Sequence, residues 1–181
     1  MTSIIKVNTI QDVGGNNLLI SNGSGSITTN NIGGQNTPAF EATISSNQAI
    51  SNSTNTKASF NTENFDTNSC YDHSSNYRFT PNVAGKYYVY VSLYVDSMSA
   101  SNFNNGDAVI KKNGSTISNG LHNFSNNPPK GLAITISTIL DMNGSSDYVE
   151  IFGSVTTINN NGGQFLSGDL SVFGAYRIIG A

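Results

Sequence analysis

The chain has few charged residues: Lys, Arg, Asp and Glu make up 10% of its 181 residues, and the formal net charge is −3. This scarcity leaves no basic patch that could follow a phosphate backbone, so we expect no binding to nucleic acid. Uncharged polar residues replace the charges, since more than a third of the chain is Asn, Ser or Thr. Such a surface forms hydrogen bonds and is insensitive to salt, which favours an extracellular or virion surface protein over a cytosolic enzyme.

Cysteine and long apolar runs are also scarce. Cys70 is the single cysteine, which excludes an intrachain disulfide and leaves stability to packing or oligomerisation. No apolar stretch approaches the roughly 20 residues of a membrane span, and we expect no membrane insertion. The start of the chain, Met1 to Lys6, lacks the basic residues and apolar run of a secretory signal. Assembly in a host cytoplasm, followed by release inside a particle, would reconcile this start with the surface-like composition.

Residues with catalytic or metal-binding chemistry are sparse. A cluster of Asp66, Cys70, Asp72 and His73 could be a metal site, a Cys–His nucleophilic pair, or a solvated loop. Its spacing matches no metal-ligand template, and the Cys–His pair lacks a residue to orient it. We therefore favour the solvated loop and expect no metal site and no cofactor.

An enzyme that hydrolyses glycans would need two carboxylates facing each other in a cleft. The spacing of the available carboxylates places no two of them together, and there is no nucleotide-binding, nucleophile-elbow or zinc-protease motif. We therefore predict that the protein is not an enzyme. The carboxylates considered are Asp141, Asp147, Glu150 and Asp169.

Residues 1–37 differ from the rest of the chain, because every Phe and Tyr lies in residues 38–181. Alternation predicts a strand over 5–10, and a Ser-, Asn- and Gly-rich turn predicts a hairpin between 18–20 and 26–28. The segment has too few apolar residues for a core of its own. It is either a flexible tail or, as we favour, a docking arm that is ordered against another chain or the body. The residues expected to dock are Ile5, Val7, Ile10, Leu18 and Ile20.

The most regular pattern is the alternation over 86–96, whose period of two predicts a long strand. One face is apolar and suits a core, whereas the other carries Tyr88, Tyr90 and Tyr94. Three tyrosines are too much aromatic area for an ordinary solvated face. They could cover a second sheet or loops of the same chain, form a ligand platform, or line a subunit interface. We favour the interface, because aromatic residues are enriched in interface cores.

The remaining patterns from Pro38 onward also predict strands, and no stretch has helical periodicity. Asn113-Gly114 predicts a two-residue hairpin, and alternation predicts a strand over 132–140. In a closing strand we expect Leu170, Val172, Gly174, Tyr176 and Ile178 to form the inner row. The sequence thus predicts an all-β sandwich or jelly roll. Its Asn- and Ser-rich loops over 97–106, 119–130 and 159–163 are candidate binding loops.

From Pro38 onward the chain resembles the globular head domain of the complement and tumour-necrosis-factor superfamily. The match rests on segments in the family order: 38–42, 60–66, Asn76 to Tyr88 (NYRFTPNVAGKYY), 144–149 and Ser171 to Tyr176 (SVFGAY). The resemblance implies a ten-stranded, tumour-necrosis-factor-like jelly-roll sandwich that assembles as a homotrimer around a threefold axis. It supports a trimer interface, which we assign to Tyr88, Tyr90, Tyr94 and Phe173.

Residues 3–12 are similar to the start of many virion proteins of marine tailed phages, in which such an arm precedes this head domain. We therefore predict a trimeric phage virion protein, a capsid decoration protein or short head fibre. Residues 1–37 would dock to other virion proteins by strand addition, and the exposed head, 38–181, would bind a host surface glycan through its loops. The alternatives are a tail fibre or baseplate receptor-binding protein and, less favoured, a secreted adhesive ligand of a cell.

Overall fold

The computed structural model describes residues 7–21, 23–24, 27–29 and 36–179. The chain divides into two compact units, which we call the arm (residues 1–35) and the body (residues 36–179). Every regular element among the described residues is a β-strand. No helix in this part of the chain is long and apolar enough to cross a membrane.

The arm contains a three-stranded antiparallel sheet in the order β1-β2-β3, with strands Thr9–Gln11, Asn17–Ser21 and Ile27–Thr29. The carboxylate of Asp12 accepts a hydrogen bond from the backbone N–H of Asn16 at 2.9 Å and closes the first turn. Where the burial of the arm is described, no residue is buried. The predicted hairpin is confirmed by the pairing of β2 with β3. Of the strand predicted over 5–10, residues 9 and 10 belong to β1, 7 and 8 do not, and 5 and 6 lie outside the described residues.

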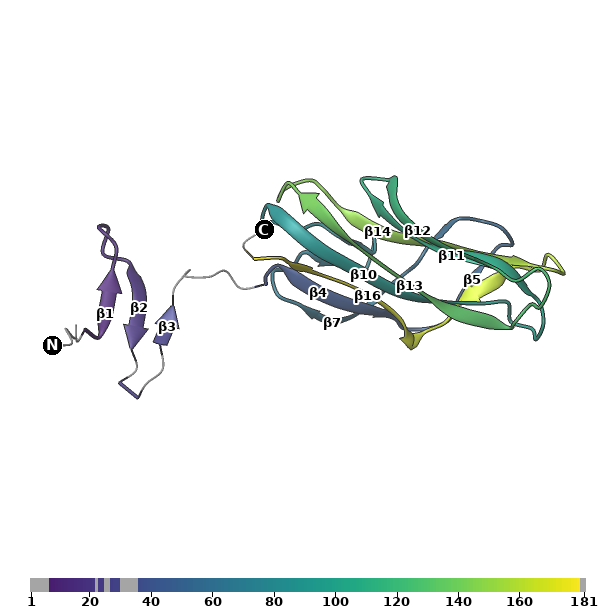
Figure 1. Cartoon of the computed structure of the whole chain (residues 1–181), viewed down its shortest axis with the longest axis horizontal. Coiled ribbons are helices and arrows are strands. Elements are labelled where there is room, and N and C mark those ends of the chain that lie inside the picture. The colour runs from purple at the N-terminus through teal and green to yellow at the C-terminus, as the bar shows by residue number, and fades with distance from the viewer. Residues whose placement is uncertain (1–6, 22, 25–26, 30–35, 180–181) are drawn as a thin grey trace. The chain divides into compact units, whose positions relative to one another are not determined.

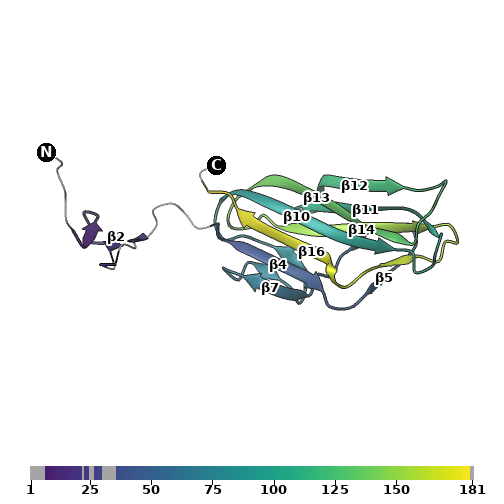
Figure 2. The same cartoon turned by 60° about the horizontal axis from the view of Figure 1, so that its bottom comes forward.

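Two antiparallel sheets make up the body (Figure 1). Sheet 1 has the order β5-β15-β10-β16-β4-β7, with β13 paired to the free side of β10; Figure 2 shows β13, β10, β16, β4 and β7 in succession. Its strands are β4 (Ala39–Ile44), β5 (Gln48–Ile50), β7 (Thr62–Asp66), β10 (Gly85–Asp96), β13 (Gly131–Met142), β15 (Gly163–Phe165) and β16 (Gly168–Arg177).

Sheet 2 has the order β12-β11-β14-β9-β8, with β6 paired to β14. Its strands are β6 (Thr56–Lys57), β8 (Tyr71–Asp72), β9 (Arg78–Phe79), β11 (Phe103–Lys112), β12 (Ser115–Asn123) and β14 (Val149–Thr157). The body therefore has thirteen strands, β4 to β16, rather than the ten that were predicted. Five of them are only two or three residues long: β5, β6, β8, β9 and β15.

The core lies between the two sheets, and β10 supplies its central row as the alternation predicts. The side chains of Tyr87, Val89, Val91, Leu93 and Val95 all point inward and are fully buried. Aromatic rings fill the space beside them and pack in stacked and edge-to-face pairs, the geometries that aromatic quadrupoles favour. These rings belong to Phe40, Phe60, Tyr71, Phe79 and Phe173.

The Asn113-Gly114 turn joins β11 to β12, which confirms the predicted hairpin. Both residues have positive φ angles, 51° and 78°, as a type I′ turn requires. This hairpin is longer than predicted, because 103–106 belong to β11 and 119–123 to β12. The loops expected over 97–106 and 119–130 are correspondingly shorter.

The inner row predicted for the closing strand is wrong. In β16, Val172, Gly174 and Tyr176 pair with outward-facing residues of β10, and Tyr176 is 39% exposed. The buried residues that face inward are instead Ser171, Phe173 and Ala175, while Gly174 is buried on the outward side, where the ring of Tyr90 lies against it. Both faces of β16 carry apolar side chains, so composition could not show which face points inward. The pairing of β16 with β10 shows it.

The two ends of the body carry different features (Figure 1). At one end the chain enters the body and β16 finishes beside it, since the N–H of Arg177 donates to the carbonyl of Pro38 at 3.2 Å. At the other end the loops 97–102, 124–130 and 158–162 gather. β10 has 12 residues and separates the two ends by about 36 Å at 3.3 Å per residue.

Candidate self-association surface

A row of three in-register residues crosses the outward side of sheet 1. Tyr90 on β10 lies opposite Gly174 on β16, which lies opposite Glu41 on β4. The Tyr90 hydroxyl donates a hydrogen bond to the Glu41 carboxylate at 2.8 Å. A Cβ atom on Gly174 would stand 2.3 Å from that hydroxyl oxygen. The missing side chain of Gly174 therefore gives the Tyr90 ring room to reach across β16.

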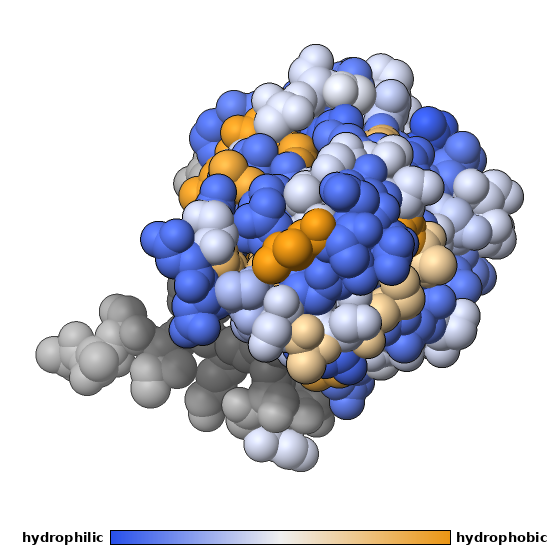
Figure 3. Space-filling model, turned by 90° about the vertical axis from the view of Figure 1, so that its right-hand side faces the viewer, coloured by the Kyte–Doolittle hydropathy of each residue, from blue (hydrophilic) through white to orange (hydrophobic). Residues whose placement is uncertain are grey.

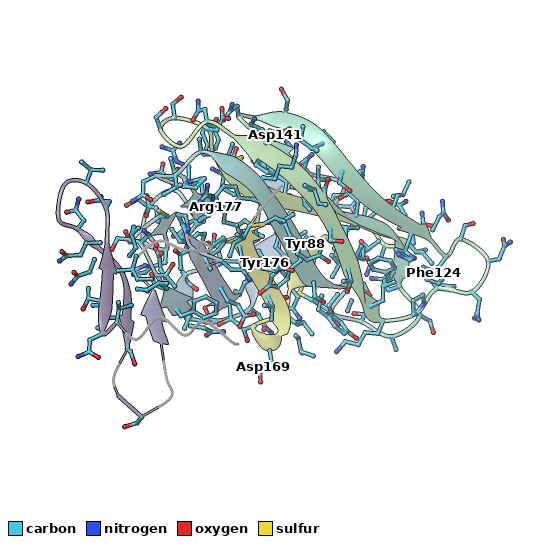
Figure 4. The ribbon with its side chains drawn as sticks, turned by 60° about the vertical axis from the view of Figure 1, so that its left-hand side comes forward. Tyr88, Phe124, Asp141, Asp169, Tyr176 and Arg177 are labelled. Atoms are coloured by element: carbon cyan, nitrogen blue, oxygen red, sulfur yellow. The ribbon has the colours of Figure 1, made fainter. Side chains whose placement is uncertain are left out.

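Tyr88 and Tyr176 form the next row, on β10 and β16 (Figure 4). Their ring centroids are 5.5 Å apart, and Tyr88 lies 6.1 Å from the ring of Tyr90. On the other side of Tyr88, Ile139 of β13 is directly opposite and 58% exposed. The half-buried Tyr94 lies further along the same side of β10, beyond Ser92. We call these side chains the tyrosine face: Tyr88, Tyr90, Tyr94, Ile139 and Tyr176.

Little charge lies on the tyrosine face. The Glu41 carboxylate is occupied by the Tyr90 hydroxyl and by the side-chain amide of Asn64 at 3.0 Å. Burial raises the pKa of Tyr90 well above its ordinary value, and the hydrogen bond to Glu41 raises it further, so this phenol is neutral at neutral pH. Lys86 and Asp141 pair with each other at 2.7 Å at the adjoining end of β10 and β13. Aromatic rings with few free charges are the composition of an interface core.

The three tyrosines predicted for a subunit interface all lie on this outward surface, and their contact with another subunit stays a prediction. The fourth residue, Phe173, is wrong as an interface residue. It is fully buried and packs edge-to-face on Phe40 at 4.9 Å, because its neighbours in β16, Val172 and Gly174, occupy the outward positions. Sequence reasoning missed Ile139 and misassigned Tyr176 to the core; the signal that finds them is the strand register.

The predicted docking residues of the arm do not all share one face. Leu18 and Ile20 are partly buried, and both lie on β2 with the spacing of one face. Ile10 is opposite Leu19 and therefore lies on the other face, where it is 45% exposed. Val7 is 51% exposed, and Ile5 lies outside the described residues. The arm thus presents apolar side chains on both sides of its sheet.

In the cluster at 66–73, the two carboxylates accept hydrogen bonds that stabilise turns. Asp66 accepts the backbone N–H of Tyr71 at 2.7 Å. Asp72 accepts backbone N–H groups of the following turn, with Ser75 contributing most, and these bonds lower its pKa far below the ordinary value. His73 faces Glu63 at 3.2 Å rather than the buried Cys70, so the Cys–His pair does not form. Among the described residues, no group of three or more His, Cys, Asp or Glu could hold a metal.

Three of the four carboxylates considered for glycan hydrolysis have a lysine partner. Asp141 pairs with Lys86 at 2.7 Å, Asp147 with Lys112 at 2.9 Å, and Glu150 with Lys57. Asp169 is exposed on β16. The three paired carboxylates therefore take part in ion pairs between residues of the strands and turns.

Comparisons with known proteins place the body in one fold. No protein-family model and no curated protein sequence matches the chain. The globular domain of zebrafish complement 1qA superposes with a TM-score of 0.56 at 16% identity, over 78% of this chain and 97% of that chain. Murine APRIL gives 0.56 at 9% identity (77% and 98% covered), and the Eiger TNF of S. frugiperda gives 0.53 at 12% (78% and 93%). The body therefore has a complement C1q/TNF-like jelly-roll fold.

Proposed function

We propose that the chain is a non-enzymatic surface protein of a phage virion, a capsid decoration protein or short head fibre. In this proposal three bodies associate through their tyrosine faces, and the arms attach the trimer to other virion proteins. The observation that carries the proposal is the contrast between the two units. The body has a dense core, whereas the arm forms a sheet without a buried side chain among its described residues.

Self-association is supported by the chemistry of the tyrosine face. A monomer would leave Ile139, Tyr176 and the half-buried Tyr88 on a surface with little charge. Three copies would bring the same rings and neutral hydroxyls together around a threefold axis, and each Glu41 carboxylate would keep its hydrogen bonds to Tyr90 and Asn64. The resemblance of the body to trimeric head domains favours three copies.

Attachment by the arm is supported by its lack of a core. A three-stranded sheet needs an apolar face packed against something to be stable, and exposed strand edges pair readily with strands of other chains. The similarity of residues 3–12 to the start of tailed-phage virion proteins favours a particle protein as the partner. The body begins at residue 36, at the end opposite the gathered loops (Figure 1), so a head anchored through its first residues would present those loops to a host surface glycan.

The same fold supports two other roles. A tail fibre or baseplate protein would use the same trimer and loops at another position on the particle. A secreted cellular ligand fits the structural neighbours, complement 1qA, APRIL and Eiger TNF, as well as the virion role does.

The first experiment is native mass spectrometry of the full chain, with an expected mass three times 19.1 kDa. Tyr88→Ser and Tyr176→Ser should shift the population to monomers. Ile117→Ser, which changes an exposed apolar residue on β12 of the other sheet, should leave the trimer intact. A monomeric wild type would overturn the trimer.

The second experiment is cryo-electron microscopy of the particle that contains the chain. Trimeric density on the capsid supports a decoration protein or head fibre, and density at the tail supports receptor binding. A chain without residues 1–36 should fail to enter particles. Incorporation of this truncated chain would overturn attachment by the arm, and a chain found only free in the medium would favour the secreted ligand.

A further inference from the structure

A hollow of about 430 Å³ lies at the loop end of the body, in the connection between β12 and β13. Its volume is within the range of roughly 300–1,000 Å³ that is typical of small-molecule sites. Figure 3 shows this end of the body as a mainly hydrophilic surface with small hydrophobic patches. The residues that line the hollow are Asn123, Phe124, Ser125, Asn126, Asn127 and Pro129.

The backbone of this loop is fixed on both sides. The N–H of Phe124 donates to the carbonyl of Asn104 at 2.7 Å, and the N–H of Phe103 donates to the carbonyl of Pro129 at 3.0 Å. The ring of Phe124 packs on the ring of Phe103, which is fully buried, at 6.1 Å and an interplanar angle of 61°. The loop is thus tied to β11 before any ligand arrives, which lowers the entropy cost of binding.

The polar side chains of the hollow are Ser125 and three asparagines, whose amides form few hydrogen bonds within the fold. Asn123 accepts one hydrogen bond from the backbone of Ser125 at 3.1 Å. The side chains of Asn126 and Asn127 make no hydrogen bond to any other described residue. Each of these amides has two N–H donors and a carbonyl acceptor. They can therefore both donate to and accept from a ligand hydroxyl.

The hollow has no charged lining residue. Lys130, the next residue after Pro129, directs its ammonium toward the buried carboxylate of Asp96 at 3.7 Å. The ring of His122 lies parallel to that of Phe124, with the centroids 6.3 Å apart. The site therefore combines one partly buried aromatic ring, that of Phe124, with neutral amides. It lacks the cations that would select a phosphate or carboxylate.

We propose that this hollow is a binding site for a neutral carbohydrate. The apolar C–H face of a sugar ring would pack on Phe124, and its hydroxyls would bond to Asn126 and Asn127. The inference rests on the proposed function, and it assigns the glycan binding to one loop and to uncharged sugars. A single open site binds weakly, and three copies on a trimer raise the overall affinity through effective concentration.

The test uses the full chain on an array of immobilised neutral oligosaccharides built from hexoses and N-acetylhexosamines. Sialylated oligosaccharides and heparin serve as anionic comparisons. We expect wild type to bind neutral sugars, Phe124→Ala to weaken binding at least tenfold, and the double variant Asn126→Ala/Asn127→Ala to weaken it about fivefold or more. Ile117→Ala, on β12 outside the hollow, should bind as wild type does. Melting temperatures show whether each variant is folded.

No binding to neutral sugars, binding only to the anionic probes, or unchanged binding by both hollow variants would overturn the proposal. If Phe124→Ala does not fold, the asparagine double variant decides, because it removes only side chains without a partner. These outcomes are separate from those for the proposed function. A trimer that enters particles and binds no sugar contradicts only the carbohydrate site.

Discussion

Replacing Gly174 by alanine is expected to destabilise the body, although the residue has no positive φ angle that would require glycine. The new Cβ would lie 2.3 Å from the hydroxyl oxygen of Tyr90 and 2.4 Å from the ring carbon that bears it. These distances are far below van der Waals contact, so the tyrosine ring has to swing away from β16. Its hydrogen bond to Glu41 is then lost.

The size of the effect follows from that bond. A hydrogen bond to a charged group contributes about 1.5–3 kcal/mol, and Tyr90 is only half-buried, so we expect the free energy of unfolding to fall by about 2 kcal/mol. For a chain of this size, that loss lowers the melting temperature by about 4–8 °C. The displaced ring also changes the shape of the tyrosine face, so the proposed trimer should dissociate at a higher protein concentration than that of wild type.

A double-mutant cycle with Tyr90→Ala tests this reasoning by urea unfolding at one fixed protein concentration. Without the tyrosine ring there is nothing for the new Cβ to displace. Gly174→Ala should then be neutral, or stabilising by about 0.4–1 kcal/mol, because alanine restricts the unfolded chain. An equal loss of stability in both backgrounds would refute the proposed clash between Gly174→Ala and Tyr90.

Three further predictions concern the core, the tyrosines and one turn. Phe173→Ala should lower the free energy of unfolding by about 3–5 kcal/mol because it empties a fully buried position; a loss below 1 kcal/mol in urea unfolding would place the ring outside the core. Burial raises the pKa of Tyr71, Tyr87 (to about 12) and Tyr90. Their raised folded-state pKa values stabilise the fold below pH 10, and this stabilisation is lost as the pH rises further. Ultraviolet titration should therefore show these three phenols ionising later than model tyrosine, and ionisation of all tyrosines near pH 10 in the folded protein would contradict this. Asp72→Ala should lower the melting temperature at neutral pH, because the hydrogen bonds that lower the pKa of this carboxylate stabilise the fold. The difference from wild type should shrink only below about pH 3.8, where the carboxylate of the unfolded chain becomes protonated and this stabilisation is progressively lost. A difference independent of pH would exclude the role of its charge.

Local patterns predicted much of the fold. The alternation over 86–96 identified β10 and its buried row, because a strand turns successive side chains to opposite faces. Asn113-Gly114 identified the β11–β12 hairpin, because these residues tolerate the positive φ angles of its turn. The same reasoning placed three tyrosines on one surface. Each of these features depends on neighbours in the chain, so the sequence determines it.

The tertiary structure decided which side of β16 faces inward and what lies beside the tyrosines. Phe173 and Tyr176 lie on opposite faces of β16, and the two faces have similar apolar content. Only the pairing of β16 with β10 selects Phe173 for the core. The row of Tyr90, Gly174 and Glu41 joins three distant segments. Strand register is set by packing across the whole sheet, so it cannot be predicted from one segment of the chain.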